Sequence, residues 1–387
     1  MTRKFDKIRN LLTRFKDLST LGLANILVYG IGSVFWLYIA SLVGINDYGE
    51  ISYFIAISTV AGVISILGAG NVLIIYTAKG EKIQSPVFFI TILSSLVSAV
   101  ILFFILNNVG VSLYIIGYVI FGLATSEALG LKLYGRYSFY IITQRILMIV
   151  LAIGLYYLMG NTGVILGIAL SFLAYSPRLY YGFKRTKMNF SVLKSKRRFI
   201  VNNYLLELSR VFSRFSDKLI IGPFFGFLVL GNYQLGIQIF YILIILPTVV
   251  YQYILPQDAS GISNKKLKKL TIYFSVGFAI LGITLAPIVV PFFLPKFLDA
   301  IEVVQIVSVA AIPASVNLMY ISKFLGREKS KIVLIGSGIF VTVQIVGIFL
   351  LGQMLGVNGI AISFVLATTS ESIYLISINR LRIVKDD

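Results

Sequence analysis

The chain of 387 residues is 58% hydrophobic and 13% charged, whereas a soluble domain is normally about half apolar and a quarter charged, so it is expected to be an integral membrane protein. It contains 0 cysteines and 0 histidines, which excludes disulfides, thiolate chemistry, imidazole catalysis and the usual zinc sites, and no cofactor is expected. A net charge of +19 invites a nucleic-acid function, but the positions of the cations, given below, favour a membrane surface instead.

Apolar segments long enough to cross a bilayer core of about 30 Å recur from Leu18 almost to the C-terminus. The first follows the basic stretch MTRKFDKIRNLLTRFK and is too long for a signal peptide, so it is expected to be a transmembrane helix. Division at polar residues, glycine and proline predicts an all-α polytopic protein of about twelve transmembrane helices. The predicted spans are 18–43, 50–77, 85–107, 110–134, 138–159, 161–183, 200–222, 228–254, 269–294, 298–325, 330–353 and 356–379.

Lysine and arginine alternate between loops in the way that the positive-inside rule requires. With both termini in the cytoplasm, the cytoplasmic segments hold all 34 basic residues except Lys296, in an outer loop, and four inside spans, Arg145, Arg210, Arg214 and Lys218. The spread of these cations along the membrane rim suits orientation and anionic lipid headgroups, so membrane lipids are expected partners and nucleic acid is not.

The basic segment KRTKMNFSVLKSKRRF divides the chain into two halves of six spans. It is expected to be a cytoplasmic, interfacial amphipathic linker over 184–199, between an N-terminal six-helix lobe, 1–183, and a C-terminal six-helix lobe, 200–387. LYIASLVGINDYG and LIIGPFFGFLVLG align without a gap, with Gly44 and Gly49 matching Gly226 and Gly231. Because both halves start in the cytoplasm, the lobes are expected to be parallel repeats, as in some transporters with a central site.

Two stretches carry a resemblance to a known family: LGLANILVYGIGSVFWLYIASLVGINDYGEISYFIAI and FSDKLIIGPFFGFLVLGNYQLGIQIF. They resemble polysaccharide or oligosaccharide (Wzx-like) flippases of the multidrug/oligosaccharidyl-lipid/polysaccharide exporter superfamily. The chain is short for that family, and Lys218 follows Asp217 where arginine is typical. The resemblance implies a lipid-linked oligosaccharide as substrate, the cell (plasma or inner) membrane as location, and glycan-assembly proteins as further partners.

Five charged residues lie in the seventh predicted span: Glu207, Arg210, Arg214, Asp217 and Lys218. At 100° per residue they share one helical stripe about 100° wide, which is typical of a span that lines a polar cavity. The stripe is roughly 16 Å long, about half of the bilayer core. Two alternatives remain: residues 184–218 could form a cytoplasmic helix with the next span starting at Leu219, or the charges could form internal structural pairs.

Arginine guanidinium groups bind phosphate oxygens bidentately and stay ionised, so Arg210 and Arg214 are candidate ligands for a phosphate or pyrophosphate. Glu207 and Asp217 could pair with these arginines in the empty site. Arg145 and Glu127 could face the same cavity or extend to the interface. Glu302 and Glu371 are expected to be interfacial. Polar residues that could bind sugars or join helices are Asn25, Asn71, Gln144, Gln234, Gln238 and Asn317.

The leading hypothesis, taken largely from the resemblance, is alternating-access flipping of a lipid-(pyro)phosphate-linked oligosaccharide from the cytoplasmic to the outer leaflet, for polysaccharide or glycoconjugate biosynthesis. The alternative is a multidrug/cation antiporter of the related multidrug-extrusion type, although Arg- and Lys-rich spans repel organic cations. A membrane enzyme is disfavoured because the loops are short and lack paired carboxylates.

Overall fold

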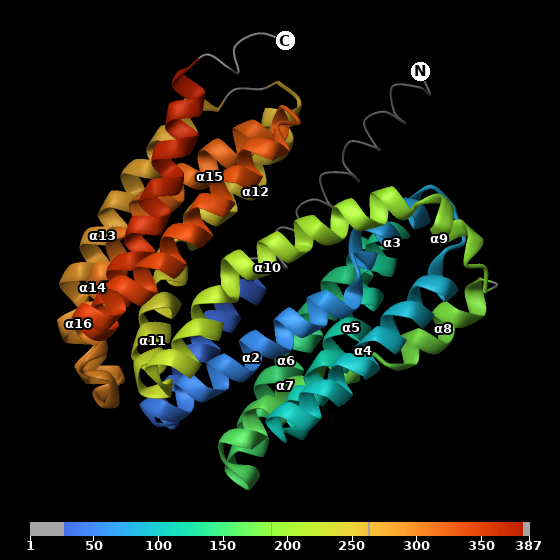
Figure 1. Ribbon diagram of the computed structural model, residues 1–387, viewed down its shortest axis with the longest axis horizontal. Helices are drawn as coiled ribbons and strands as arrows, with labels where there is room; N and C mark the ends of the chain where they lie inside the picture. Colours follow the sequence, from blue (N-terminus) through green and yellow to red (C-terminus); the bar gives the residue numbers. More distant parts are fainter. Residues whose placement is uncertain (1–26, 187, 262–263, 382–387) are drawn as a thin grey trace, which may run out of the picture. The chain divides into compact units, whose positions relative to one another are not determined.

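The computed structural model describes residues 27–186, 188–261 and 264–381. Every element over these ranges is a helix (Figure 1). The start of the first predicted span, the basic N-terminal residues, Asn25, Arg382 and Lys385 lie outside the described residues.

The described chain up to Phe225 forms ten helices. They are Leu27–Leu42, α2 (Ile45–Ile66), α3 (Ala69–Ala78), α4 (Gln84–Leu106), α5 (Val109–Gly130), α6 (Tyr134–Met159), α7 (Asn161–Leu173), α8 (Pro177–Arg185), α9 (Ser191–Ser195) and α10 (Arg197–Phe225). The rest of the chain forms α11 (Phe227–Leu243), α12 (Ile245–Ala259), α13 (Lys265–Phe293), the short 3₁₀ helix η1 (Pro295–Phe297), α14 (Ala300–Val309), α15 (Ala311–Gly326) and α16 (Ser330–Arg380).

These helices confirm the predicted all-α polytopic architecture. Eight are long and apolar enough to cross a membrane, and α11 with α12 forms a ninth span that is bent by 50°. Helix α16 contains two predicted spans, because Gly356 breaks it with a φ of 59° and a ψ of −138°. With the shorter helix Leu27–Leu42 and the charged α10, the described helices account for each of the twelve predicted spans.

The described chain divides into two compact units. Unit 1 comprises the described residues up to Gly32 and Ile57–Leu208, and unit 2 comprises Ser33–Ala56 and the described residues from Ser209 onward. Helix Leu27–Leu42, α2 and α10 therefore each pass from one unit into the other. The predicted linear division of the chain at 184–199 stays a prediction.

Unit 1 is a helix bundle in which α5 packs against α3, α4 and α7. Its core includes Leu73 of α3, Phe88 of α4 and Leu123 of α5, each fully buried. The outer face of α4 is also apolar: Phe104 is 80% exposed and Val100 is 55% exposed. Large apolar side chains exposed along one face of a helix are expected to contact lipid tails.

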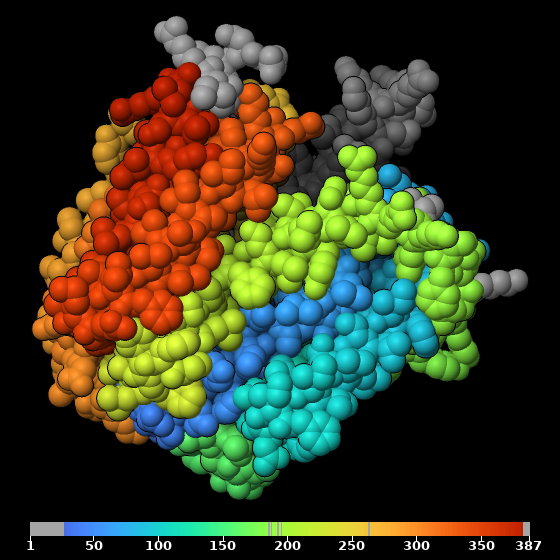
Figure 2. Space-filling model, viewed as in Figure 1, coloured from blue at the N-terminus to red at the C-terminus, as the bar shows by residue number. Residues whose placement is uncertain are grey.

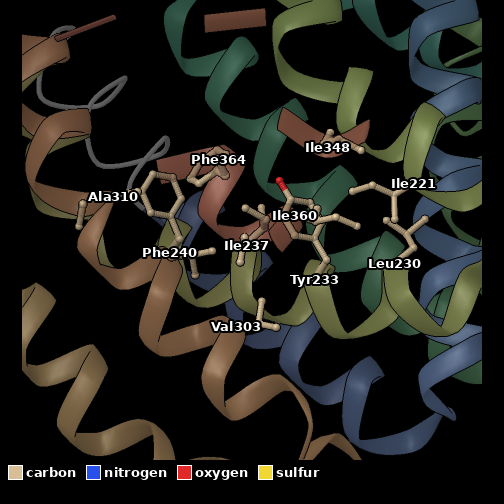
Figure 3. Close-up of a cluster of buried hydrophobic side chains, with 13 residues drawn as sticks. Ile221, Leu230, Tyr233, Ile237, Phe240, Val303, Ala310, Ile348, Ile360 and Phe364 are labelled. Carbon is tan, nitrogen blue, oxygen red and sulfur yellow. The ribbon is translucent and has the colours of Figure 1, made fainter. Parts of the chain in front are cut away.

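Unit 2 is built on the packing of α11 against α14, α12 against α15, and α15 against α16. A cluster of buried apolar side chains in this unit comes from α10, α11, α14, α15 and α16 (Figure 3). Tyr233 lies among Ile221, Leu230 and Ile237 in this cluster. A phenol buried in this way needs a hydrogen-bond partner for its hydroxyl group, and α10 provides one.

A turn that appears once in each unit identifies the internal repeat in three dimensions. LYYLMGNTG (155–163) and LGQMLGVNG (351–359) each hold a glycine with a positive φ and a ψ near −140°, Gly160 and Gly356. Three residues later, Gly163 and Gly359 approach the carbonyls of Leu155 and Leu351 so closely that no side chain fits. Equivalent turns with equivalent contacts indicate that the two halves share one fold.

Two further glycines, equivalent in the two halves, form a reciprocal contact inside unit 2. Gly49 of α2 packs on the carbonyl of Phe227, and Gly231 of α11 packs on the carbonyl of Ile45. Under the alignment of the two halves, Gly49 is equivalent to Gly231 and Ile45 to Phe227. A contact in which each partner uses the same residues is the signature of a two-fold axis, so α2 and α11 are related by a local pseudo-two-fold.

Candidate functional site

The charged stripe lies on α10, one continuous helix of 29 residues (Figure 1, yellow-green). Its length of about 43 Å exceeds a bilayer core of about 30 Å, and the stripe occupies its middle. The helix does not break at Leu219, where the alternative of a cytoplasmic helix placed the start of a new span. Because α10 carries so many charged residues, its composition alone does not identify it as a membrane span.

The N-terminal end of α10 is fixed within unit 1. Just before the helix, the Nζ of Lys196 lies 3.0 Å from Oε1 of Glu81 and above the ring of Tyr76. Eleven residues further, roughly 16 Å along the axis, Glu207 accepts a hydrogen bond of 3.3 Å from the Nδ2 of Asn71. The carboxylate of Glu207 thus lies deep along the helix and contacts an amide of α3.

The C-terminal part of the stripe is enclosed within unit 2. Asp217 and Lys218 are 4% and 5% exposed, and Lys218 Nζ lies 3.2 Å from Asp217 Oδ2. The hydroxyl of Tyr233 donates to the same oxygen at 3.0 Å, and Gln344 donates to that hydroxyl at 3.4 Å. This chain of contacts supplies the partner that the buried Tyr233 needs and joins α10, α11 and α16.

Arg210 and Arg214 differ from their neighbours because both side chains are exposed on α10. The guanidinium carbon of Arg214 lies 5.6 Å from the ring centre of Tyr241, close enough for a cation–π contact. Arg210 acts electrostatically on Tyr251 of α12 and forms no ion pair with another described residue. Side chains of α10 are at the surface of the face seen in Figure 2.

The two candidates of the first half lie on neighbouring helices of unit 1. Arg145, on α6, is partly buried; its guanidinium lies beside Gly32, and its Nη1 is 3.4 Å from Met148 Sδ. Glu127, on α5, is 0% exposed and lies 3.5 Å from the guanidinium of Arg178. Arg178 also lies over the rings of Tyr140 and Tyr181. Glu127 therefore has a cation from α8 beside it.

Sequence reasoning missed one buried carboxyl group. Glu371, expected at an interface, is only 9% exposed, because α16 continues to Arg380 and α15 packs against it. Its Oε2 accepts a hydrogen bond of 3.0 Å from Asn317, whose amide also donates to the carbonyl of Thr368 at 3.1 Å. Glu371 forms no ion pair with any other described residue.

The uncharged polar residues within spans mostly join helices. Gln144 of α6 donates to Ser171 of α7 at 3.0 Å, and Asn317 joins α15 to α16. Gln234 and Gln238 are buried on α11. Among the described residues, no group of three or more Asp, Glu, His or Cys side chains could hold a metal ion.

Solved structures with the same architecture are membrane transporters. A multidrug resistance MATE family transporter of the MOP superfamily, in an inward-facing conformation, matches with a TM-score of 0.73 and 16% identity, over 93% of this chain and 95% of that one. The lipid II flippase MurJ matches with a TM-score of 0.74 and 13% identity, over 93% of this chain and 87% of that one. The fold is that of the MATE and MurJ transporters. No family model matches the sequence, and a search of curated proteins finds no match.

Proposed function

We propose that this multi-pass membrane protein flips a lipid-(pyro)phosphate-linked oligosaccharide from the cytoplasmic to the outer leaflet of the cell membrane by alternating access, for polysaccharide or glycoconjugate biosynthesis. Two resemblances support a flippase: the Wzx-like stretches of the sequence, and the fold shared over 93% of the chain with a lipid II flippase. The proposed reaction is transport, so no catalytic residue is assigned.

The observation that carries the proposal is the pair of exposed guanidinium groups, Arg210 and Arg214, halfway along α10. A cation at bilayer depth is costly, and such residues usually mark a substrate route. Four residues separate the two arginines, so they lie on one face about 6 Å apart along the axis. Two guanidinium forks at that spacing suit the two phosphates of a pyrophosphate.

The same charge suits outward movement of an anion. A membrane potential that is negative inside the cell contributes about 2.3 kcal/mol per elementary charge per 100 mV to the export of a negative headgroup. Tyr241 and Tyr251, which lie near the two arginines, could stack against sugar rings. Glu207, Arg145 and Glu127 are proposed as further substrate-binding residues, with Asp217 and Lys218 positioning the C-terminal half of α10.

The test is complementation: each variant is expressed in cells that lack this protein, and polysaccharide export is measured. The variant Arg210→Ala/Arg214→Ala should abolish export while inserting at the wild-type level, and Arg210→Lys/Arg214→Lys should retain charge but transport slowly, because lysine cannot bind bidentately. A matched control removes two exposed cations elsewhere, Arg136→Ala/Lys184→Ala, and should export normally. Normal export by the arginine-to-alanine variant would remove the basis of the proposal.

A second candidate, a multidrug/cation antiporter, is favoured by one feature, the buried Glu371. A carboxyl group in a span with an amide partner and no cation can take up and release a proton or another small cation. The likeness to MATE transporters over 93% of this chain supports the same reading.

Ethidium efflux from cells that express the protein separates the two candidates. An antiporter should extrude ethidium, and Glu371→Gln should stop extrusion while preserving the hydrogen bond from Asn317, because the glutamine carbonyl also accepts. A flippase should leave ethidium in the cells whatever residue occupies position 371.

A further inference from the structure

The end of unit 2 that the positive-inside rule assigns to the cytoplasm carries a cluster of cations from two helices. Lys265 and Lys268 lie in the first turn of α13, and Lys323 and Arg327 lie at the end of α15. These four residues are here called the cationic cluster. None of them belongs to the charged stripe of α10, and the proposed transport route does not use them.

The contacts within unit 2 bring the two helix ends together. Lys268 Nζ lies 2.6 Å from Oδ2 of Asp258, the oxygen to which Ser322 of α15 also donates. Lys323, next to Ser322, is close enough to Lys265, Lys268 and Arg327 for each to act on it electrostatically. Cations from α13 and α15 therefore surround one carboxylate of α12.

Among the described residues at this point, most of the charged side chains are cationic. Asp258 faces the cluster, and Glu328, which follows Arg327, is exposed. Lys323 is partly buried and donates to the side-chain oxygen of Asn379 on α16, so water screens its charge incompletely. Cations this close to one another repel, as Lys265, Lys268 and Lys323 do, and a bound anion would relieve that repulsion.

The position of the cluster indicates what kind of anion binds. The cluster lies where membrane helices end, at the level of lipid headgroups, and the next turns of α13 expose the apolar side chains of Leu270, Tyr273 and Phe274. Basic sites between the cytoplasmic ends of transmembrane helices suit phosphate headgroups whose tails lie along the helices. We propose that the cationic cluster binds the phosphate group of a lipid in the cytoplasmic leaflet.

Two lipids share this chemistry: a resident anionic phospholipid and the phosphorylated lipid that the transporter is proposed to carry. Phosphatidylglycerol and farnesyl pyrophosphate serve as their probes, and each is titrated separately against the purified full-length protein by native mass spectrometry. The titrations compare the wild type, Lys265→Ala/Lys323→Ala, and the control Arg136→Ala/Lys184→Ala, which removes two exposed cations of unit 1.

Loss of two cluster cations should weaken binding of at least one probe about tenfold or more, whereas the control should change it less than about twofold. The probe that loses affinity identifies which lipid occupies the site. Because Lys323 contacts Asn379, Lys265→Ala/Arg327→Ala repeats the comparison with two exposed side chains. Equal loss in the control, or wild-type affinity in both cluster variants, would overturn the proposal. Neither result would bear on Arg210 and Arg214, so this proposal can fail while the transport proposal stands.

Discussion

Asp217 and Lys218 provide the sharpest test of what the charges of α10 do. In the structure they neutralise each other inside unit 2, with the ammonium group 3.2 Å from the carboxylate and the Tyr233 hydroxyl 3.0 Å from the same oxygen. Replacing Asp217 by Asn leaves the ammonium group of Lys218 buried without its counter-charge. Loss of one partner of a buried ion pair typically costs about 3–5 kcal/mol in the free energy of unfolding.

The neutral double variant Asp217→Asn/Lys218→Met removes both charges, keeps an acceptor for Tyr233, and should recover most of that loss. Tyr233→Phe removes one hydrogen bond to a charged group and should cost about 1.5–3 kcal/mol. The measurement is unfolding of the purified variants in SDS, followed by circular dichroism. In parallel, export by the double variant reports whether the substrate needs these two charges.

A structural role for the pair predicts that the double variant is stable and still exports. If the double variant is as unstable as Asp217→Asn alone, the two charges do not compensate each other and the physical reasoning fails. If it is stable but exports nothing, the pair contacts the substrate, as the helical stripe first suggested.

Three further predictions concern packing and helix ends. Gly163→Ala and Gly359→Ala would each force a methyl group into a carbonyl oxygen, so each should lower the unfolding free energy by about 1–3 kcal/mol in SDS titration. The control Gly338→Ala should be neutral or stabilising, because no atom lies within 4 Å of the position its methyl group would take. Lys296→Met removes the ammonium group that donates to the carbonyls of Leu42 and Val43 at 3.1 and 3.5 Å, and should cost about 1 kcal/mol by the same titration, with Lys296→Arg retaining most of the stability. Arg178→Leu removes the cation 3.5 Å from the buried Glu127 and should lower the free energy of unfolding by about 3–5 kcal/mol. Adding Glu127→Gln to this variant should restore stability. A wild-type thermal midpoint for Arg178→Leu alone would show that the pair contributes nothing.

Apolar length and the distribution of lysine and arginine were sufficient to predict the helices of this protein. Each predicted span corresponds to a described helix or helix pair because the bilayer requires about 20 apolar residues per crossing, whatever their neighbours. Breaks within spans were less predictable. Leu67 and Gly68, between α2 and α3, have φ values of 53° and 72°, yet this glycine was not recognised as a break within the predicted span 50–77.

The repeat was weak in sequence for a physical reason. The aligned halves share little beyond glycines, since many apolar side chains can fill the same space between helices. Glycine is different where a carbonyl of another helix occupies the place of its side chain, as at Gly49 and Gly231. The residues that preserve the repeat are therefore those that no other residue type can replace.

The candidate site could be predicted only in part. Charged residues in a span stand out by composition, which identified the stripe on α10, and the exposed arginines lie on it as expected. Glu371 was missed because the sequence shows only its distance from the end of an apolar run. Its burial depends on α15 packing against α16 and on the amide that Asn317 supplies from another helix.

Predicting a cavity from a helical stripe assumes that the surroundings of the helix are the same all along its axis. This assumption fails for α10. Asp217 and Arg210 lie only about 20° apart on the helical wheel, yet Asp217 is buried and Arg210 is exposed, because the neighbouring helices change over two turns. Near Asp217 the helix is enclosed by Tyr233 of α11 and Gln344 of α16. Arg210 is exposed instead, and the neighbouring group it acts on electrostatically is Tyr251 of α12. The difference between the buried and the exposed charges therefore follows from the position of each residue along α10, and it makes Arg210 and Arg214 the more accessible cations of the stripe.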